Sequence, residues 1–262
     1  MPTPVLHAET RGEGPLLVLA HGFTQSGRVW GGLADDLAAD HRVVLVDLPG
    51  HGGSADCRAD LIQGAGLLGD AGGAADYLGY SMGARFCLHL ALARPDLVRR
   101  LVIVSGTAGI DDPGKRAERQ RADEALAERL DPSGRGRPLD TVAEFVDRWV
   151  SNPLFGDVPR AANGLDERKR NTAAGLASSL RLAGTGTQEP LWGRLGELSM
   201  PVIVLTGSRD TKFTALGRRM VEAIGANASE VEIAGTDHAP HLQRPHAVAT
   251  VMRTFLAGAD HV

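Results

Sequence analysis

Residues 79–83, with the sequence Gly-Tyr-Ser-Met-Gly, constrain the fold of this chain more than any other stretch. The pattern G-x-S-x-G is typical of a sharp turn between a strand and a helix, which exposes the serine hydroxyl above a sheet. Glycines are needed on both sides of Ser81, because a Cβ atom at either place would collide with neighbouring backbone. A short strand is expected to end at Leu78, and residues 85–94 predict a helix that Pro95 stops. The segment therefore predicts a strand, a turn and a helix that present Ser81 as a nucleophile.

Further apolar runs predict buried strands, because they are rich in leucine or β-branched residues and end at turn signals. These strands are expected at residues 16–20, 43–46, 101–104, 202–205 and, with a weaker pattern, 230–233. Predicted helices lie around residues 33–39, 85–94, 216–224 and 247–256. Since strand and helix alternate, we expect an α/β fold with a mostly parallel, doubly wound sheet. The boundary before the serine turn is not defined, because residues 64–73 are rich in glycine and residues 74–76 are a poor strand sequence.

Residues 109–198 interrupt the alternation. This stretch is charged and rich in predicted helix, contains no convincing strand, and is broken by glycine and proline. We interpret it as a helical cap that is inserted into a core formed by residues 1–108 and 199–262. Residues 115–130 predict a helix rich in arginine and glutamate, and such charges usually lie on a solvated face.

Length and charge narrow the possible functions. A chain of 262 residues with 43% hydrophobic content can bury a large core. Its formal charge of −4, with both signs interspersed, argues against nucleic-acid binding and against a polybasic membrane anchor. No stretch approaches the roughly 20 apolar residues of a membrane helix, and the first residues lack a signal peptide pattern. Cys57 and Cys87 lack the spacing of a metal site. We therefore expect a cytoplasmic enzyme that acts on a small molecule without a metal.

The nucleophile needs two partners elsewhere in the chain. A serine hydroxyl reacts poorly unless a histidine takes its proton, and that histidine needs a carboxylate to fix its tautomer. When a turn of this kind presents the serine, the acid and then the histidine follow along the chain. Asp210 follows the expected strand 202–205, and His238 follows the expected strand 230–233. Because ligands bind at the carboxyl ends of strands in open α/β sheets, the sequence predicts a triad of Ser81, Asp210 and His238.

Other interpretations of these positions stay open. Asp210 could serve only as the N-cap of a helix that begins at Thr211. His241, His246 and Asp237 compete for the histidine and acid roles. The choice depends on which side chains the fold brings next to the serine hydroxyl, and the sequence does not determine this.

A negatively charged transition state also needs two backbone N–H groups that point at the developing charge. Met82 supplies one of them by its position after the serine. We assign the other to Phe23, in the loop of residues 21–24, where glycine permits a close backbone approach. His21 is interpreted as a residue that organises this loop, and residues 47–54 as scaffold.

Several segments together resemble one known family. They lie at residues 21–23, 47–54, 79–85, 152–155, 179–188, 191–192 and 210–213. The first three occur in many hydrolases, whereas Leu-Arg-x-x-Gly-Thr-Gly at 180–186 and Asp-x-Lys-Phe at 210–213 are more particular. Over nearly its whole length the chain thus resembles the α/β-hydrolase superfamily and, within it, the 2-succinyl-6-hydroxy-2,4-cyclohexadiene-1-carboxylate (SHCHC) synthases, or MenH enzymes, of menaquinone biosynthesis.

The resemblance implies a lyase. Members of that family eliminate pyruvate from a cyclohexene that carries an enolpyruvyl group, a succinyl group and a ring carboxylate. By this resemblance the triad acts as a base that removes a ring proton. The N–H groups of Phe23 and Met82 would stabilise the charge that develops on the succinyl ketone oxygen. No cofactor is implied, because the conjugated carbonyl accepts the electrons.

The substrate of that family has three carboxylates, and arginine is suited to bind them because its planar guanidinium donates two parallel hydrogen bonds. By motif match the resemblance assigns substrate binding to Arg85, to Arg119 in the first cap helix and to Arg168 in a later one. It also assigns Tyr80 and Trp149 to the pocket. The expected partner is therefore a small polycarboxylate.

The assignment of the cap arginines is not unique. Neighbouring residues Arg116, Arg121 and Arg170 are alternatives, and any of these side chains could equally form a solvated salt bridge. The chain also departs from the family pattern, since Asp237 stands where a glycine usually precedes the histidine and Arg244 where an acid usually precedes a proline. Asp237 could raise the pKa of the histidine or compete for its hydrogen bond.

Two other functions fit the same residues. A carboxylesterase or lactonase would use the triad for acyl transfer and would keep its activity when Arg85 is changed to alanine. A non-catalytic ligand receptor on a hydrolase fold would keep its function in a Ser81→Ala variant. The sequence does not determine the oligomeric state.

Overall fold

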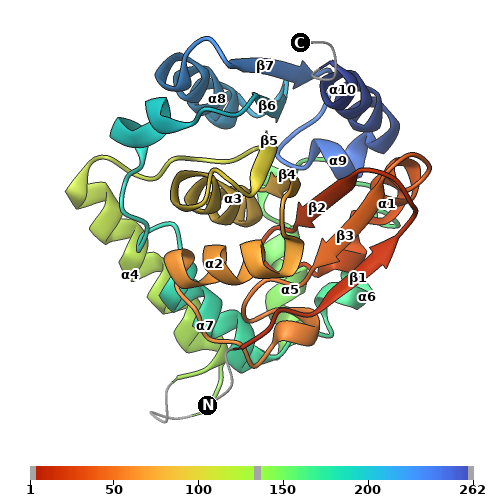
Figure 1. The fold of residues 1–262 in the computed structure, drawn as a ribbon. Helices are drawn as coiled ribbons and strands as arrows, with labels where there is room; N and C mark the ends of the chain where they lie inside the picture. Colours follow the sequence, from red (N-terminus) through yellow and green to blue (C-terminus); the bar gives the residue numbers. More distant parts are fainter. Residues whose placement is uncertain (1–3, 133–136, 259–262) are drawn as a thin grey trace.

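A seven-stranded sheet forms the centre of the computed structural model, which describes residues 4–132 and 137–258 (Figure 1). The strands are β1 (Ala8–Arg11), β2 (Leu16–Ala20), β3 (Arg42–Val46), β4 (Ala75–Tyr80), β5 (Val98–Val104), β6 (Val202–Gly207) and β7 (Ala228–Ile233). Their order is β1-β3-β2-β4-β5-β6-β7. Within these ranges only β1 and β3 pair antiparallel. The predicted α/β fold with a mostly parallel sheet is therefore confirmed.

Helices cover both faces of the sheet (Figure 1). On one face lie α2 (Leu61–Gly72), α3 (Met82–Ala93) and α8 (Thr211–Ile224), and on the other lie α1 (Gly31–Leu37) and α10 (Pro245–Ala257). Side chains alternate between the two faces along each strand, so Val18 packs under α2 and α3 whereas Leu17 and Leu19 pack under α1. Short helical turns η1 (Gly27–Trp30), η2 (Gly52–Ser54) and α9 (Pro240–Gln243) lie in the loops. The sheet is thus buried between two apolar layers, as its β-branched sequences require.

Two elements form where the sequence pattern is weak. Most of the glycine-rich stretch 64–73 lies in α2, which Asp60 caps by accepting a hydrogen bond from the Gln63 N–H at 2.8 Å. β4 follows it, and all six residues of this strand are buried, with β2 and β5 on either side. The carboxylate of Asp76 in this strand lies 3.3 Å from the guanidinium of Arg100. Burial between two strands therefore outweighs a poor local propensity.

The chain leaves the sheet after β5 and returns at β6, the neighbouring strand, where Val104 is level with Leu205. Between them lie α4 (Pro113–Leu130), α5 (Val142–Val150), η3 (Pro153–Phe155), α6 (Leu165–Arg168), α7 (Ala173–Ala183) and η4 (Trp192–Glu197). α4 and α7 pack together, and their apolar residues form a third cluster with Phe145 of α5. The described residues of this segment contain no strand, as the sequence predicts. None of the described helices is both long and apolar enough to span a membrane.

Candidate active site

Ser81 lies at the sharp turn between β4 and α3. Its φ of 50° is a strained conformation for a residue with a side chain, and its N–H donates to the Val104 carbonyl of β5 at 2.9 Å. A Cβ atom on Gly83 would collide with the carbonyl oxygen of Ala20, and one on Gly79 would collide with the start of α3. The structure therefore contains the turn that the sequence pattern predicts.

Side chains from three strand ends form a chain of hydrogen bonds. Ser81 Oγ lies 3.2 Å from His238 Nε2, and His238 Nδ1 lies 2.8 Å from Asp210 Oδ2. The imidazole and the carboxylate are each only 3% exposed. The other oxygen of Asp210 accepts a hydrogen bond from the Phe213 N–H at 3.2 Å and caps α8. Asp210 thus has both of the interactions that its sequence position suggests, and the geometry allows a serine proton to pass to an oriented imidazole.

Aromatic rings enclose the imidazole of His238. Its ring centroid lies 4.2 Å from that of Phe213, 5.6 Å from that of Tyr80 and 6.0 Å from that of Phe155. The His238 N–H donates to the Leu154 carbonyl at 3.4 Å, so η3 lies against the histidine loop. These contacts exclude water from the imidazole and fix its plane.

The competing side chains have other partners. His241 is buried against Tyr80, with ring centroids 4.2 Å apart, and burial lowers its pKa well below the ordinary value. His246 lies 2.5 Å from a carboxylate of α1. Asp237 accepts a hydrogen bond from the side-chain amide of Gln243 at 2.9 Å. Asp237 therefore has its own donor, and Asp210 is the carboxylate that bonds the imidazole.

Phe23 and Met82 line the same cavity as Ser81. Within the described ranges neither backbone N–H donates to another residue. The Phe23 loop is a tight turn, in which the Gln25 N–H donates to the Gly22 carbonyl at 3.1 Å. Two free donors beside a nucleophile are what an anionic intermediate requires.

Two buried histidines, His21 and His51, stabilise this turn and the loop next to it by accepting backbone hydrogen bonds. Nε2 of His21 accepts a hydrogen bond from the Leu48 N–H at 3.0 Å, and Nε2 of His51 accepts one from the Thr24 N–H at 3.3 Å. Burial lowers the pKa of His21 to about 4 and that of His51 to about 3. Both rings are therefore neutral at neutral pH and keep the lone pair that accepts the backbone N–H. His21 organises the loop, as the sequence predicts.

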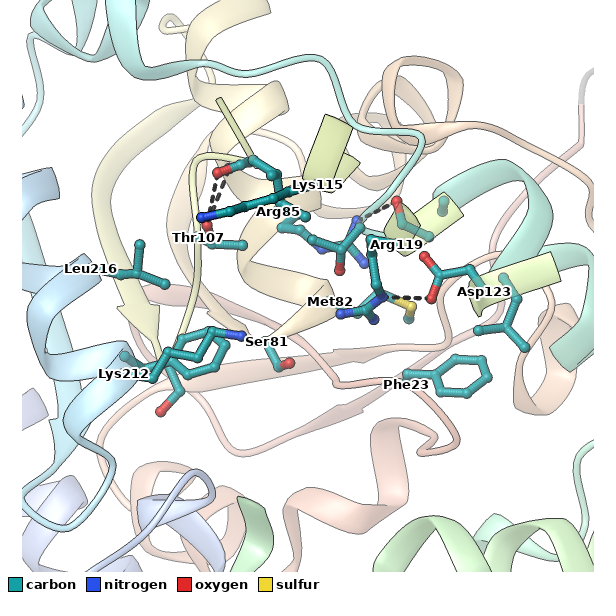
Figure 2. Close-up of a pocket in the computed structure, with 18 of the residues that line it drawn as sticks. Phe23, Ser81, Met82, Arg85, Thr107, Lys115, Arg119, Asp123, Lys212 and Leu216 are labelled. Carbon is teal, nitrogen blue, oxygen red and sulfur yellow. Dashed lines mark hydrogen bonds and ion pairs between the residues drawn. The ribbon is translucent and has the colours of Figure 1, made fainter. Parts of the chain in front are cut away.

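A cavity of about 570 Å³ opens beside Ser81 (Figure 2). Five cationic side chains from α3, α4 and α8 line it: Arg85, Lys115, Arg119, Lys212 and Arg219. Three carboxylates also line it: Asp111, Asp112 and Asp123. Cations thus exceed anions around the cavity, which favours a negatively charged ligand. In the described part of the chain no cluster of His, Cys, Asp or Glu could hold a metal ion.

Arg85 and Arg119 are two of the arginines that the resemblance assigns to substrate binding, and both line the cavity. Arg85 is buried, and its Nη1 donates to the Gly184 carbonyl at 3.2 Å. Burial, followed by the charge of Arg119, lowers the pKa of Arg85 to about 10, so it remains charged at neutral pH. Arg119 donates to Asp123 at 2.8 Å, and its side chain is 38% exposed. One carboxylate thus faces two guanidinium groups, which leaves room for an anionic ligand.

Arg168, which the resemblance assigns to substrate binding, is not among the residues that line this cavity. Its guanidinium is buried because α6 packs on η1, and its Nη1 donates to the Thr24 hydroxyl at 2.5 Å. Tyr80 is also buried and is absent from the cavity lining. Trp149 does line the cavity, with its ring centroid 4.9 Å from that of Phe23.

Three cavity cations have no assigned role in the sequence analysis. Lys212 and Arg219 lie on α8 together with Leu216, which also lines the cavity, and Lys115 lies in the first turn of α4. Figure 2 labels Lys115, Lys212 and Leu216. The guanidinium of Arg219 stacks on the Trp192 ring at 3.7 Å. The sequence signal for Lys212 and Arg219 was the spacing of residues 212, 216 and 219, which places them on one face of the helix that Asp210 caps.

Comparisons with known proteins agree with this architecture. The sequence matches the alpha/beta hydrolase family over residues 17–251. It is 31% identical over 262 residues to a putative SHCHC synthase of Bacillus subtilis, with 93% of this chain and 92% of that protein covered. It is 32% identical over 251 residues to the SHCHC synthase of Klebsiella pneumoniae, with 93% and 94% covered.

Solved structures give the same result. MenH from S. aureus superposes with a TM-score of 0.84 at 27% identity, covering 96% of this chain and 98% of that one. A thermophilic esterase from Thermogutta terrifontis superposes with a TM-score of 0.79 at 22% identity, covering 96% and 93%. The second likeness concerns the fold alone.

Proposed function

Because the chain belongs to the alpha/beta hydrolase family, we propose that it uses the serine, histidine and aspartate of that fold, here as a lyase of menaquinone biosynthesis. The proposed reaction eliminates pyruvate from an enolpyruvyl-succinyl-cyclohexene carboxylate to give SHCHC. The observation that carries the proposal is the hydrogen-bonded chain from Asp210 through His238 to Ser81, which ends in a cavity rich in cations. The likeness to SHCHC synthases supports this choice of substrate.

In the proposed mechanism the Ser81 oxygen and the His238 imidazole act together as the base. They remove the ring proton next to the succinyl ketone, and Asp210 stabilises the imidazolium that forms. Negative charge develops on the ketone oxygen, where the N–H groups of Phe23 and Met82 stabilise it. The electron pair then forms the second ring double bond as the bond to the enolpyruvyl oxygen breaks. Enolpyruvate leaves, takes up the proton that His238 holds and becomes pyruvate.

The cavity cations are proposed to bind the substrate carboxylates. Arg85 is the main ligand in this proposal, because it is buried and each charged hydrogen bond in such a place contributes about 1.5–3 kcal/mol. Arg119 contributes less, since it is partly exposed and already donates to Asp123. Trp149 supplies an apolar wall for the ring. We also propose that residues 109–198 act as a cap over a core of residues 1–108 and 199–262.

Pyruvate release tests this proposal. The purified protein is mixed with the enolpyruvyl substrate, and pyruvate is followed by its reduction with lactate dehydrogenase and NADH. We expect turnover by the wild type, a loss of at least a thousandfold in the Ser81→Ala variant, and a raised KM in the Arg85→Met variant. A folded wild-type protein that releases no pyruvate above the uncatalysed rate would refute the lyase assignment.

A carboxylesterase is the second candidate, because an esterase of known structure has the same fold and a serine–histidine–aspartate chain also performs acyl transfer. The two candidates differ in their need for the cavity cations. Rapid hydrolysis of p-nitrophenyl acetate that is unchanged by Arg85→Met, without pyruvate release, would favour the esterase. Slow ester hydrolysis with rapid pyruvate release would favour the lyase.

A further inference from the structure

A second buried arginine, Arg168, has no place in the proposed substrate contacts. The residue is 2% exposed, and within residues 4–132 and 137–258 it forms no ion pair with a carboxylate. An unpaired guanidinium in the interior is unfavourable unless its N–H groups find acceptors. The acceptors here are neutral oxygens: the Asn163 carbonyl at 2.7 Å, the Thr24 hydroxyl at 2.5 Å and the Phe23 carbonyl at 3.4 Å.

Asn171 holds the same turn from the same segment of the chain. Its side-chain N–H donates to the Thr24 carbonyl at 2.7 Å, and its side-chain oxygen accepts from the Gly52 N–H at 2.9 Å. Together with His51, which accepts from the Thr24 N–H at 3.3 Å, these contacts satisfy the N–H, the carbonyl and the hydroxyl of Thr24. Every polar group of this residue is therefore bonded to a side chain outside its own loop.

Thr24 needs such support because of its backbone conformation. Its φ of 66° lies in the left-handed region, which is unfavourable for a β-branched residue. This conformation sets the direction of the preceding residue, Phe23, which lines the cavity with Ser81 and whose N–H donates to no other described residue. Without the external hydrogen bonds the turn would relax towards an ordinary conformation, and the Phe23 N–H would turn away from the serine.

We propose that Arg168 is a positioning residue, which acts with Asn171 to hold the Thr24 turn so that the Phe23 N–H points at the reacting oxygen. This rests on the proposed role of the Phe23 N–H in the reaction. Arg168 comes from α6, in the segment between β5 and β6, whereas the turn follows β2; the two lie 144 residues apart in sequence. The donor that stabilises negative charge is thus complete only while this segment is docked on the turn.

The alternative role for Arg168 is a direct contact with a substrate carboxylate. The structure argues against it, because Phe23 lines the cavity while the Arg168 guanidinium lies behind the turn and is bonded to its oxygens. The two roles predict different kinetics. A positioning residue affects the chemical step and leaves binding unchanged, whereas a carboxylate ligand affects binding first.

The experiment compares Arg168→Met with a matched control, Arg170→Met, which removes an exposed arginine paired with Glu167. The first readout is the rate of covalent labelling of Ser81 by diisopropyl fluorophosphate, whose phosphoryl oxygen needs the same N–H donors and which requires no natural substrate. The second readout is kcat and KM for pyruvate release. We expect labelling and kcat to fall together by about ten- to a hundredfold in Arg168→Met, with KM within twofold and the control unchanged.

A raised KM with unchanged labelling would overturn the inference and make Arg168 a substrate ligand. If Arg168→Met does not fold, as judged by circular dichroism, the pair Thr24→Ser and Thr24→Ala decides. The serine variant keeps the hydroxyl acceptor and should label at nearly the wild-type rate, and the alanine variant should label at least fivefold more slowly; equal rates would refute the role of this contact. Normal labelling of the wild type without pyruvate release would refute the lyase assignment and leave the inference standing.

Discussion

The strand ends differ from the helical wall of the cavity, formed by side chains of α3, α4 and α8, in how their polar groups are bonded. At the strand ends, His238 and Asp210 are 3% exposed and bonded to each other, and the turn of Phe23 is held by buried groups on several sides. Along the helical wall, Arg119 and Arg219 are partly exposed and are paired with two acids that line the cavity, Asp123 and Asp111. One region is fixed before a ligand arrives, and the other has ion pairs that a ligand can replace.

Because of this difference, we expect the strand ends to determine kcat and the helical wall to determine KM. Groups that are buried and fully bonded can stabilise a transition state without reorganising, so their loss should lower kcat. Cations that already have a carboxylate partner exchange one anion for another when substrate binds, so their loss should raise KM. Variants in each region test whether the division holds.

Asp210→Asn should have the largest effect. The asparagine oxygen can still cap α8 through the Phe213 N–H, but the amide favours the wrong tautomer of His238. We expect kcat to fall by about 10³–10⁴-fold, with KM changed by less than threefold and a melting temperature close to that of the wild type. Steady-state kinetics and thermal unfolding measure this. An effect on KM alone would break the division between the two regions.

Arg85→Met should raise KM by about 10- to 100-fold, because it removes one charged hydrogen-bonding group from a buried site. The matched control is Arg194→Met, which removes an exposed arginine paired with Glu197 and should change neither constant. A large loss of kcat at unchanged KM would mean that Arg85 acts on the chemical step, as the groups at the strand ends do, and not on substrate binding.

The buried histidines behind the Phe23 turn predict acid sensitivity. Because burial lowers the folded-state pKa of His51 to about 3, the unfolded chain binds its proton first as the pH falls below about 6.5. The stability from this group is therefore present above about pH 6.5 and is lost as the pH falls towards 3. Between these two pKa values, each such histidine makes the free energy of unfolding fall by about 1.4 kcal/mol for every pH unit, which is a tenfold change in the unfolding constant.

Urea unfolding at several pH values between 4 and 7 tests this linkage. In the His51→Gln variant the glutamine oxygen can accept the Thr24 N–H without titrating, so the slope should fall by about 1.4 kcal/mol per pH unit. His246→Gln is the control, because that side chain is 86% exposed. Equal slopes in the wild type and His51→Gln would mean that the turn is not held by a neutral ring.

Arg119→Gln should have the smallest effect, a rise in KM of about two- to fivefold, because its charge is partly solvated and screened. The rise should shrink when KM is measured at 0.5 M sodium chloride instead of 0.05 M. An effect larger than that of Arg85→Met would reverse their order and make the exposed end of the wall the principal binding site.

The sequence predicted those parts of the site whose signals are local. The turn around Ser81 has its own glycine pattern, and Asp210 and His238 each follow a recognisable strand. β2 was predicted with its observed bounds, Leu16–Ala20. These features depend on neighbours within a few residues, which the sequence displays directly.

Other parts depend on packing between distant segments. β1 (Ala8–Arg11) is a half-exposed edge strand without an apolar run, and it was not predicted. β5 begins at Val98, three residues before the expected start, because its pairing with β4 extends the strand past two arginines. Arg168 would look the same in sequence whether it faced a ligand or Thr24. Only the packing of α6 on η1 decides between these, and no local pattern records it.

The adjacency of β5 and β6 has an evolutionary consequence. Since the helices between them start and finish at neighbouring strands, one contiguous stretch of gene encodes all of these helices, and recombination could exchange it while the sheet register persists. An exchanged segment between β5 and β6 would still need residues that take the place of Arg168 and Asn171. An exchange of this segment could therefore change substrate selectivity in one step. The rate of turnover would be kept only if the new segment also formed the hydrogen bonds that hold the Thr24 turn.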